Sequence, residues 1–143
     1  MQTEMSFREK SAWISFVTIL LVFGAYFWNV VRVLGGQVDY GAAFKVEVGL
    51  LVAFVVIEIV LHIAIALQAP DEARAPRDER EWLIEMRATR VAFQVLVVGA
   101  LAGVGMIHLT RSVWAMSQVV LLAVVMAQLV KFGGQIVYFR RGV

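Results

Sequence analysis

Residues Val46 to Leu67 read VEVGLLVAFVVIEIVLHIAIAL, an apolar run that carries two ionisable side chains, Glu58 and His62. A helix of about 20 mainly apolar residues is long enough to cross a bilayer. A charged side chain near the bilayer centre costs on the order of 2.5–3.5 kcal/mol on insertion scales. The run therefore predicts a membrane-spanning helix in which Glu58 and His62, one helical turn apart, need compensating partners.

Three further apolar runs of similar length accompany this one. The chain of 143 residues is 61% hydrophobic and 17% charged, against roughly 45–50% apolar and about 25% charged residues in soluble domains. The sequence therefore predicts a single all-α domain over residues 1–143, an integral membrane four-helix transmembrane bundle. Its expected spans cover residues 12–34, 46–67, 91–109 and 114–138, and a charged segment covers residues 68–90.

The basic residues are distributed unevenly between the two ends of the predicted spans. Nine are expected on one side of the membrane and three, Arg32, Lys45 and Arg111, on the other. Cytoplasmic loops carry the excess of Lys and Arg. We therefore expect a multi-pass protein of a bacterial cytoplasmic (inner) membrane, with both termini and segment 68–90 in the cytoplasm. The nine are Arg8, Lys10, Arg74, Arg77, Arg80, Arg87, Arg90, Arg140 and Arg141.

The amino-acid composition of segment 68–90 changes near its middle. From Asp78 onward it is rich in helix formers, so we expect a helix that continues into the third span and projects roughly 18–20 Å into the cytoplasm. This projection is the candidate cytoplasmic docking surface. The alternative is that its charges only set the topology and form a solvated helix face. The docking candidates are Arg80, Trp82, Glu85 and Arg87.

Polar side chains of three predicted spans fall at similar depth in the cytoplasmic half of the membrane. At a rise of 1.5 Å per residue, they lie about 5 to 15 Å from the cytoplasmic ends of their spans. One interpretation is a structural Glu58–Lys131 ion pair, with the other groups as interhelical hydrogen-bond partners. The other is a functional polar pocket: a proton relay, an ion path or a ligand site. The layer comprises Glu58, His62, Gln94, Gln128, Lys131 and Gln135.

Several classes of site are not expected in this sequence. There is no cysteine, and Glu58 with His62 gives two plausible metal ligands where structural zinc wants four. A haem held by His62 and His108 is disfavoured because their depths differ by roughly 18–20 Å. No Ser–His–Asp pattern surrounds Ser15, Ser112 or Ser117, and a net charge of +2 is too small to suggest nucleic-acid binding. We therefore expect no cofactor, no metal and no enzyme activity.

Gly99 and Gly103 form a GxxxG motif in the third span. Such glycines allow two helices to approach closely in a membrane. They predict tight helix packing, and we expect the protein to be a homodimer.

Three short segments carry a resemblance: DEREWLIEMRATR leading into VAFQVL, FREKSAWIS at residues 7–15, and YFRRG at residues 138–142. With them the chain resembles a group of small, uncharacterised bacterial membrane proteins with four spans. Genes of such proteins often look paired with one for a small helix-turn-helix regulator. The resemblance implies a membrane protein that holds or restrains a cytoplasmic DNA-binding regulator, and it supplies no ligand or catalytic residue.

Two functions therefore remain as predictions. The first is a regulatory or interaction module that lies in the bilayer and binds a cytoplasmic partner. The alternative is an oligomeric small transporter or channel that uses the polar layer around Glu58, His62 and Lys131.

Overall fold

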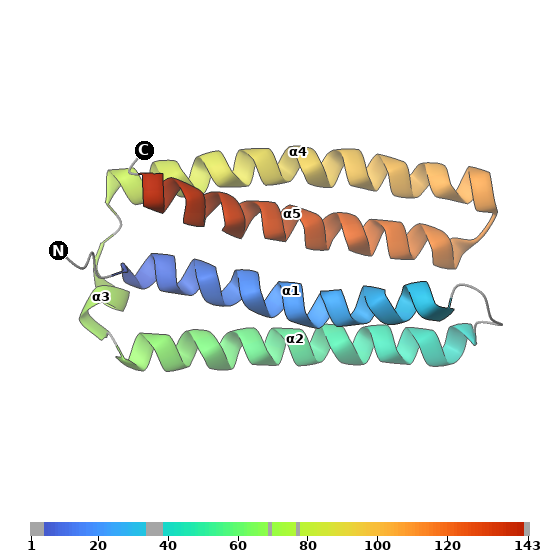
Figure 1. Ribbon diagram of the computed structural model, residues 1–143, viewed down its shortest axis with the longest axis horizontal. Helices are drawn as coiled ribbons and strands as arrows, with labels where there is room; N and C mark the ends of the chain where they lie inside the picture. Colours follow the sequence, from blue (N-terminus) through green and yellow to red (C-terminus); the bar gives the residue numbers. More distant parts are fainter. Residues whose placement is uncertain (1–4, 34–38, 69, 77, 142–143) are drawn as a thin grey trace. The chain divides into compact units, whose positions relative to one another are not determined.

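The computed structural model describes residues 5–33, 39–68, 70–76 and 78–141. Within these residues the chain is entirely helical apart from short connections, and no strand occurs. Four helices are long, and the short α3 lies between the second and third of them (Figure 1). The predicted all-α class is confirmed. The helices are α1 (Phe7–Val33), α2 (Tyr40–Gln68), α3 (Pro70–Arg74), α4 (Glu79–Thr110) and α5 (Val113–Arg141).

The chain divides into two compact units, residues 1–75 and 76–143. The first contains a hairpin of α1 and α2 followed by α3, and the second contains a hairpin of α4 and α5 (Figure 1). The helix predicted from Asp78 is present, because α4 runs without a break from Glu79 to Thr110.

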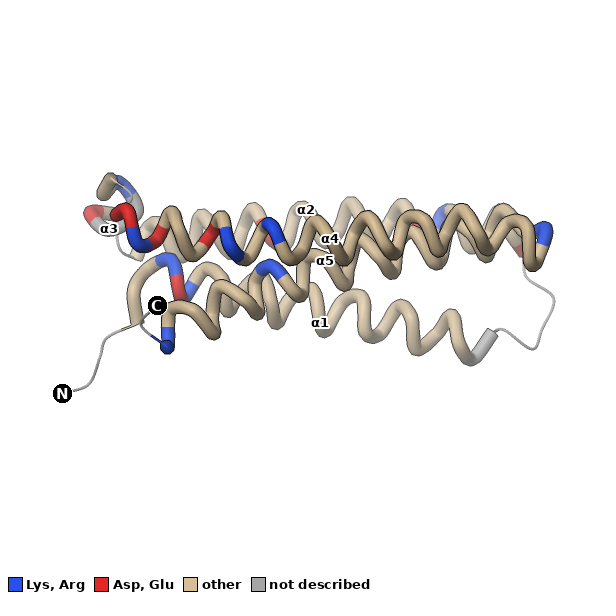
Figure 2. Tube along the Cα trace, turned by 90° about the horizontal axis from the view of Figure 1, so that it is seen from above, with Lys and Arg blue, Asp and Glu red and all other residues tan. Residues whose placement is uncertain are grey.

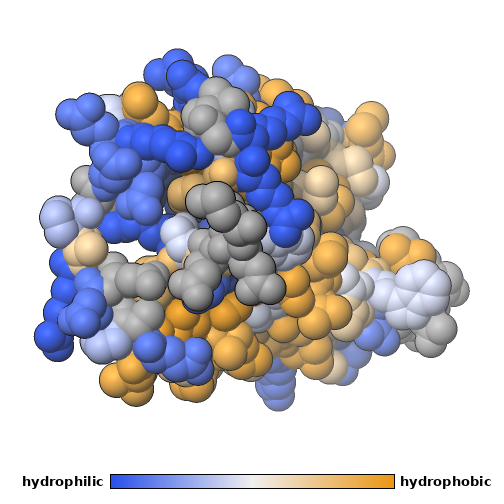
Figure 3. Space-filling model, turned by 60° about the vertical axis from the view of Figure 1, so that its left-hand side comes forward, coloured by the Kyte–Doolittle hydropathy of each residue, from blue (hydrophilic) through white to orange (hydrophobic). Residues whose placement is uncertain are grey.

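All four long helices are long and apolar enough to cross a membrane. The most apolar stretch of α2 has a mean hydropathy of 2.9, yet only 6% of it is buried inside the protein. Exposing such a surface to water costs roughly 25 cal/mol of free energy for each Å² of apolar area. The hydrocarbon core of a bilayer avoids this cost, so these helices contact the lipid bilayer. Hydrophobic and hydrophilic side chains are segregated on the face in Figure 3.

Charged residues gather near the helix ends (Figure 2). In the second unit, the acidic and basic residues that open α4 lie at the same end of the hairpin as Arg140 and Arg141, which close α5. In the first unit, Arg8, Glu9 and Lys10 open α1 at the end where α2 leads into α3. Each hairpin thus has an apolar middle and one strongly charged end.

Side-chain caps define where two of the helices begin. Asp39 Oδ1 accepts hydrogen bonds from the backbone N–H groups of Gly41 and Ala42, at 3.0 and 3.2 Å. Ser112 Oγ accepts one from the backbone N–H of Ala115, at 3.2 Å. The first N–H groups of a helix have no partner within the helix, so these caps stabilise the starts of α2 and α5.

The turn between α4 and α5 depends on Arg111. This residue adopts the left-handed conformation, with φ 53° and ψ 21°, and its N–H donates to the carbonyl of Ile107 at 2.9 Å. Glycine is the usual residue at such a helix C-terminus, since a side chain is strained there. The third and fourth predicted spans are therefore joined by a tight turn, at a position that disfavours arginine.

The face of α1 that packs on α2 is built from steps of three and four residues. Ala12, Ser15, Ile19, Phe23 and Tyr26 are its buried residues. This spacing keeps one stripe of a helix facing its neighbour. The Phe23 ring meets the Phe54 ring of α2 edge-on, with centroids 5.2 Å apart. Apart from the Tyr26 hydroxyl, Ser15 has the one polar side chain among these five buried residues.

The contact between α4 and α5 is made by small residues. A Cβ added to Gly99 would overlap Ala123 Cβ and lie 3.2 Å from Ala123 Cα, and one added to Gly103 would lie 2.5 Å from Val120 Cγ2. Farther along, Gly134 of α5 faces Ala88 of α4. The two backbones therefore run close together, and the GxxxG motif serves a contact within one chain.

Candidate functional site

A cluster of three polar side chains joins α1 to α2. Ser15 Oγ donates a hydrogen bond to Glu58 Oε2 at 2.8 Å, and the same oxygen lies 3.5 Å from His62 Nε2. His62 Nδ1 lies 2.8 Å from the Glu58 carbonyl oxygen and 3.4 Å from Glu58 Oε2. Ser15 therefore connects the two ionisable groups that the sequence places in the middle of an apolar span.

The helices themselves position these groups. Glu58 and His62 are four residues apart in α2, so both side chains lie on the same face. The hydrogen bond with the Glu58 carbonyl fixes the orientation of the imidazole ring and directs Nε2 towards α1. Ser15 occupies the buried stripe of α1 opposite, where it is 1% exposed.

The Glu58 carboxyl is mostly enclosed, with its side chain 17% exposed, against 40% for His62. Its second oxygen, Oε1, is buried and has no hydrogen-bond partner among the described residues. A buried acceptor without a partner costs about 1–3 kcal/mol, and more if it is charged. Glu58 thus has one satisfied oxygen and one that remains available to a proton or another donor.

The cluster contains the residue types of a serine nucleophile triad without its geometry. In such a triad the serine hydroxyl donates to the imidazole, which the carboxylate orients from the other side. Here the hydroxyl donates to the carboxylate instead, and the imidazole is 0.7 Å farther away (3.5 against 2.8 Å). Ser15 is also buried in the interior of α1. The arrangement is suited to sharing a proton.

Ser15 is the residue that the sequence interpretation missed. It is 43 residues from Glu58 and 47 from His62, and only the pairing of α1 with α2 brings them together. The absence of a neighbouring histidine or acid in sequence was therefore a misleading criterion. A useful signal was present in the three- and four-residue spacing that places Ser15 in the buried stripe.

The remaining members of the predicted polar layer belong to the second unit. Gln94 and Gln128 are exposed, and Gln135 is half-buried. Lys131 is half-buried, with Nζ 5.5 Å from the centroid of the Phe132 ring. Because Glu58 and Lys131 belong to different units, the ion pair between them stays a prediction.

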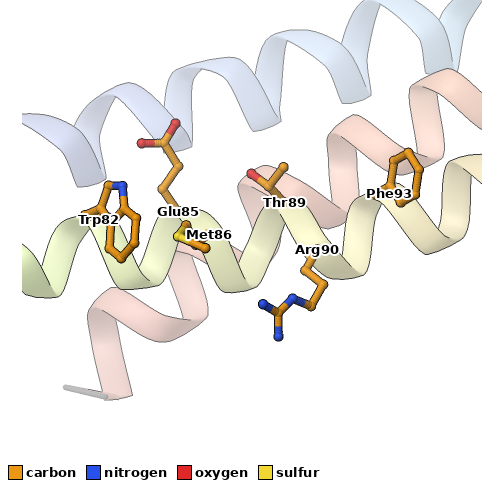
Figure 4. Close-up of a pocket in the computed structure, with 6 residues that line it drawn as sticks. All are labelled: Trp82, Glu85, Met86, Thr89, Arg90 and Phe93. Atoms are coloured by element: carbon orange, nitrogen blue, oxygen red, sulfur yellow. The ribbon is translucent and has the colours of Figure 1, made fainter.

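The predicted docking residues of α4 fall on two faces. Trp82 and Glu85 line a hollow of about 490 Å³, whereas Arg80 and Arg87 do not (Figure 4). Steps of three and four residues along α4 place the lining side chains on one face. The lining residues are Trp82, Glu85, Met86, Thr89, Arg90 and Phe93.

No group of three or more metal-ligating side chains occurs in the part of the chain that the structure describes. His108 is exposed near the end of α4, at the opposite end of its hairpin from the α4 start. The polar cluster of Ser15, Glu58 and His62 therefore remains the candidate site in the first unit.

Comparison with known proteins identifies the family but not an activity. Neither the curated proteins nor the solved structures contain a match to this chain. A family model does match, and it covers residues 8–143, which include all four long helices except Phe7. The match confirms the resemblance to small multi-pass membrane proteins that the sequence suggests. The chain belongs to the family described as Predicted membrane protein (DUF2178).

Proposed function

We propose that this protein is a membrane-embedded interaction module that binds a cytoplasmic protein through the hollow on α4. The observation that carries the proposal is the composition of that hollow, which combines exposed apolar side chains with Glu85 and Arg90 (Figure 4). Trp82 is 51% exposed. Trp and Arg are enriched among the residues that dominate binding energy at protein interfaces.

The chemistry of the hollow defines the partner. A matching surface presents an apolar ridge that fits between Trp82 and Phe93, with an acidic group opposite Arg90. The resemblance to proteins whose genes accompany a helix-turn-helix regulator supports a DNA-binding protein as this partner. In this proposal the module restrains the regulator at the membrane and does not itself contact nucleic acid.

The proposal includes an orientation. The excess of Lys and Arg supports a bacterial inner membrane protein whose termini and α4 start face the cytoplasm. A homodimer would present two copies of the hollow. Binding, rather than catalysis, is the proposed activity.

Capture from native membranes tests the proposal. We expect a specific cytoplasmic protein to co-purify with the full chain, and Trp82→Ala together with Glu85→Arg to reduce its recovery at least tenfold. Leu83→Ala is the matched control, because Leu83 is exposed on the same helix and does not line the hollow. Recovery that is equal for the double variant and the control would overturn the docking surface.

The alternative function is an oligomeric small transporter or channel, and the cluster of Ser15, Glu58 and His62 favours it. Polar and ionisable groups within membrane spans often mark the path of an ion or a proton. Proteoliposomes loaded with a pH-sensitive dye test this candidate. Proton flux that the wild type shows and Glu58→Gln lacks would support it, and equal flux in both would contradict it.

A further inference from the structure

The Ser15 hydroxyl lies between two groups that can each hold a proton. It is 2.8 Å from Glu58 Oε2 and 3.5 Å from His62 Nε2. A hydroxyl has one proton to donate and two lone pairs with which to accept. It can therefore donate to one of these neighbours while it accepts from the other.

The tautomer of His62 follows from its second contact. Nδ1 lies 2.8 Å from the Glu58 carbonyl oxygen, which can only accept, so Nδ1 carries a hydrogen. Nε2 then faces Ser15 either as an acceptor, in the neutral ring, or as a donor, in the cation.

With one proton shared between Glu58 and His62, every hydrogen bond in the cluster can form. If His62 holds the proton, Nε2–H donates to Ser15 and Ser15 donates to the Glu58 carboxylate. If Glu58 holds it, the carboxylic acid donates to Ser15 and Ser15 donates to the neutral His62. Both arrangements have no net charge, which is the least costly condition within an apolar span.

Each of the other two protonation states leaves a polar group without a hydrogen-bond partner and gives the cluster a net charge. Without the proton, Ser15 donates to the Glu58 carboxylate, His62 Nε2 has no donor and the cluster carries a negative charge. With a second proton, Ser15 can donate to Glu58 Oε2 only if the acid hydrogen lies on Oε1, which has no partner among the described residues, and the cluster carries a positive charge. Buried polar groups favour the state in which their hydrogen bonds are satisfied.

We propose that Ser15, Glu58 and His62 form a binding site for one proton, which Ser15 relays between the imidazole and the carboxylate. In the transfer, the Nε2–H bond breaks as a new O–H bond forms at Ser15, and the original Ser15 proton passes to Glu58 Oε2. The hydroxyl is regenerated and no other reactant is needed. This inference deepens the transport candidate by naming its ion, but the site can exist without transport.

The rest of the hairpin isolates this site. Between Lys10 and Tyr26, α1 has no ionisable side chain, and between Glu47 and its end, α2 has only Glu58 and His62. Lys131 of α5 is the further charge whose proximity the depth argument predicts. Apart from Glu58, His62 and Tyr26, the ionisable side chains that the structure describes in the helices of this unit lie towards the hairpin ends: Arg8, Glu9, Lys10, Tyr40, Lys45, Glu47, Asp71 and Arg74.

Infrared difference spectroscopy across a pH titration tests the proposal with the full chain in lipid nanodiscs. A His108→Gln background leaves His62 as the only imidazole, because the sequence has two histidines. Glu58→Gln identifies the carboxyl band of Glu58. We expect the imidazole and Glu58 bands to change over the same pH interval, because coupled groups lose a shared proton together.

Substitutions at Ser15 provide the decisive comparison. Ser15→Ala removes the hydroxyl without adding atoms, and it should separate the two band changes or abolish one. Ser15→Thr keeps a hydroxyl and should leave them together. Circular dichroism and size-exclusion chromatography check that each variant is folded. Band changes over separate pH intervals in the wild type, or an unaltered coupling in folded Ser15→Ala, would overturn the proposal.

The same preparations separate this inference from transport. If the coupled band changes are present but proteoliposomes show no proton flux, the proton site stands and the transport candidate fails. If flux is present but the bands are uncoupled, the relay fails and transport uses another route.

Discussion

The two hairpins of this protein are held together in different ways. In the α1–α2 hairpin, large side chains such as Phe23 and Phe54 separate the helices, and a hydrogen-bonded cluster crosses the gap. In the α4–α5 hairpin, Gly99 and Gly103 bring the backbones into close contact. Lipid provides little hydrophobic drive for helix association, so packing of small residues and polar bonds must replace it.

The difference has a functional consequence. At Gly99 and Gly103 the contact leaves no room for a larger residue, because an added Cβ would overlap the neighbouring helix. A contact made through Ser15, Glu58 and His62 depends on protonation, because its hydrogen bonds change with the number of protons present. In the two proposals, the first unit therefore contains the hairpin that responds to protonation, and the second supports the proposed docking surface on α4.

The largest expected effect comes from filling the small-residue contact. Gly99→Ala should destabilise the protein by about 1–3 kcal/mol, because the new Cβ overlaps Ala123. Gly105→Ala is the matched control, since nothing lies within 4 Å of a Cβ at that position of the same helix. Unfolding by denaturing detergent, followed by circular dichroism, measures both. Equal stability of the two variants would show that the α4–α5 contact is looser than described.

A smaller effect is expected from breaking the polar contact. Ser15→Ala should cost about 1–2 kcal/mol, because it removes an interhelical hydrogen bond within the membrane. Ser117→Ala is the control, since the Ser117 hydroxyl donates to the carbonyl of Trp114 in its own helix. Detergent unfolding of the two variants compares them. A Ser117→Ala protein that is less stable than Ser15→Ala would contradict the account of the first hairpin.

Lys131 provides a test that links the two hairpins. If Lys131 forms the predicted ion pair with Glu58, then Lys131→Met and Glu58→Gln should be non-additive by at least about 0.5 kcal/mol. Lys131→Met paired with Ser117→Ala serves as the additive control. Additivity within error for both pairs would leave Ser15 and His62 as the partners of Glu58 and remove Lys131 from the site.

The smallest effect is expected at the turn between α4 and α5. Arg111→Gly should stabilise the protein by up to about 1 kcal/mol, because glycine adopts the left-handed conformation without strain. Arg111→Ala, which removes the charge but keeps the strain, should show no such gain. A shift in the detergent midpoint separates them, and a loss of stability in Arg111→Gly would mean that the arginine side chain itself stabilises the turn.

Much of this fold could be predicted from the sequence, because apolar length alone determines a membrane span. The four long helices, the continuous α4 and the turn at Arg111 follow from composition and spacing. The partner of Glu58 could not be predicted, since the sequence shows which groups need compensation but not which helices pair. Depth arithmetic selected Lys131 because it is charged, and it overlooked Ser15 because a hydroxyl is an inconspicuous feature of an apolar helix.

The predicted docking residues show a second limit of prediction from the sequence. The sequence groups Arg80, Trp82, Glu85 and Arg87 because they are close in the chain, but a helix separates neighbours by about 100° each. The structure keeps Trp82 and Glu85 on the hollow with Arg90 and Phe93. Helical phase, rather than proximity in sequence, determines which side chains share a surface.

A double-mutant cycle between Ser15 and Glu58 measures whether the polar cluster holds α1 and α2 together. The stabilities of the wild type, Ser15→Ala, Glu58→Met and the double variant are measured by detergent unfolding in the same lipid mixture, because methionine removes the oxygen that accepts from Ser15. The hydrogen bond of 2.8 Å between α1 and α2 predicts a favourable coupling energy of about 0.6 to 1.7 kcal/mol. A coupling energy of zero, with all four proteins folded, would contradict the claim that this polar cluster joins the two helices.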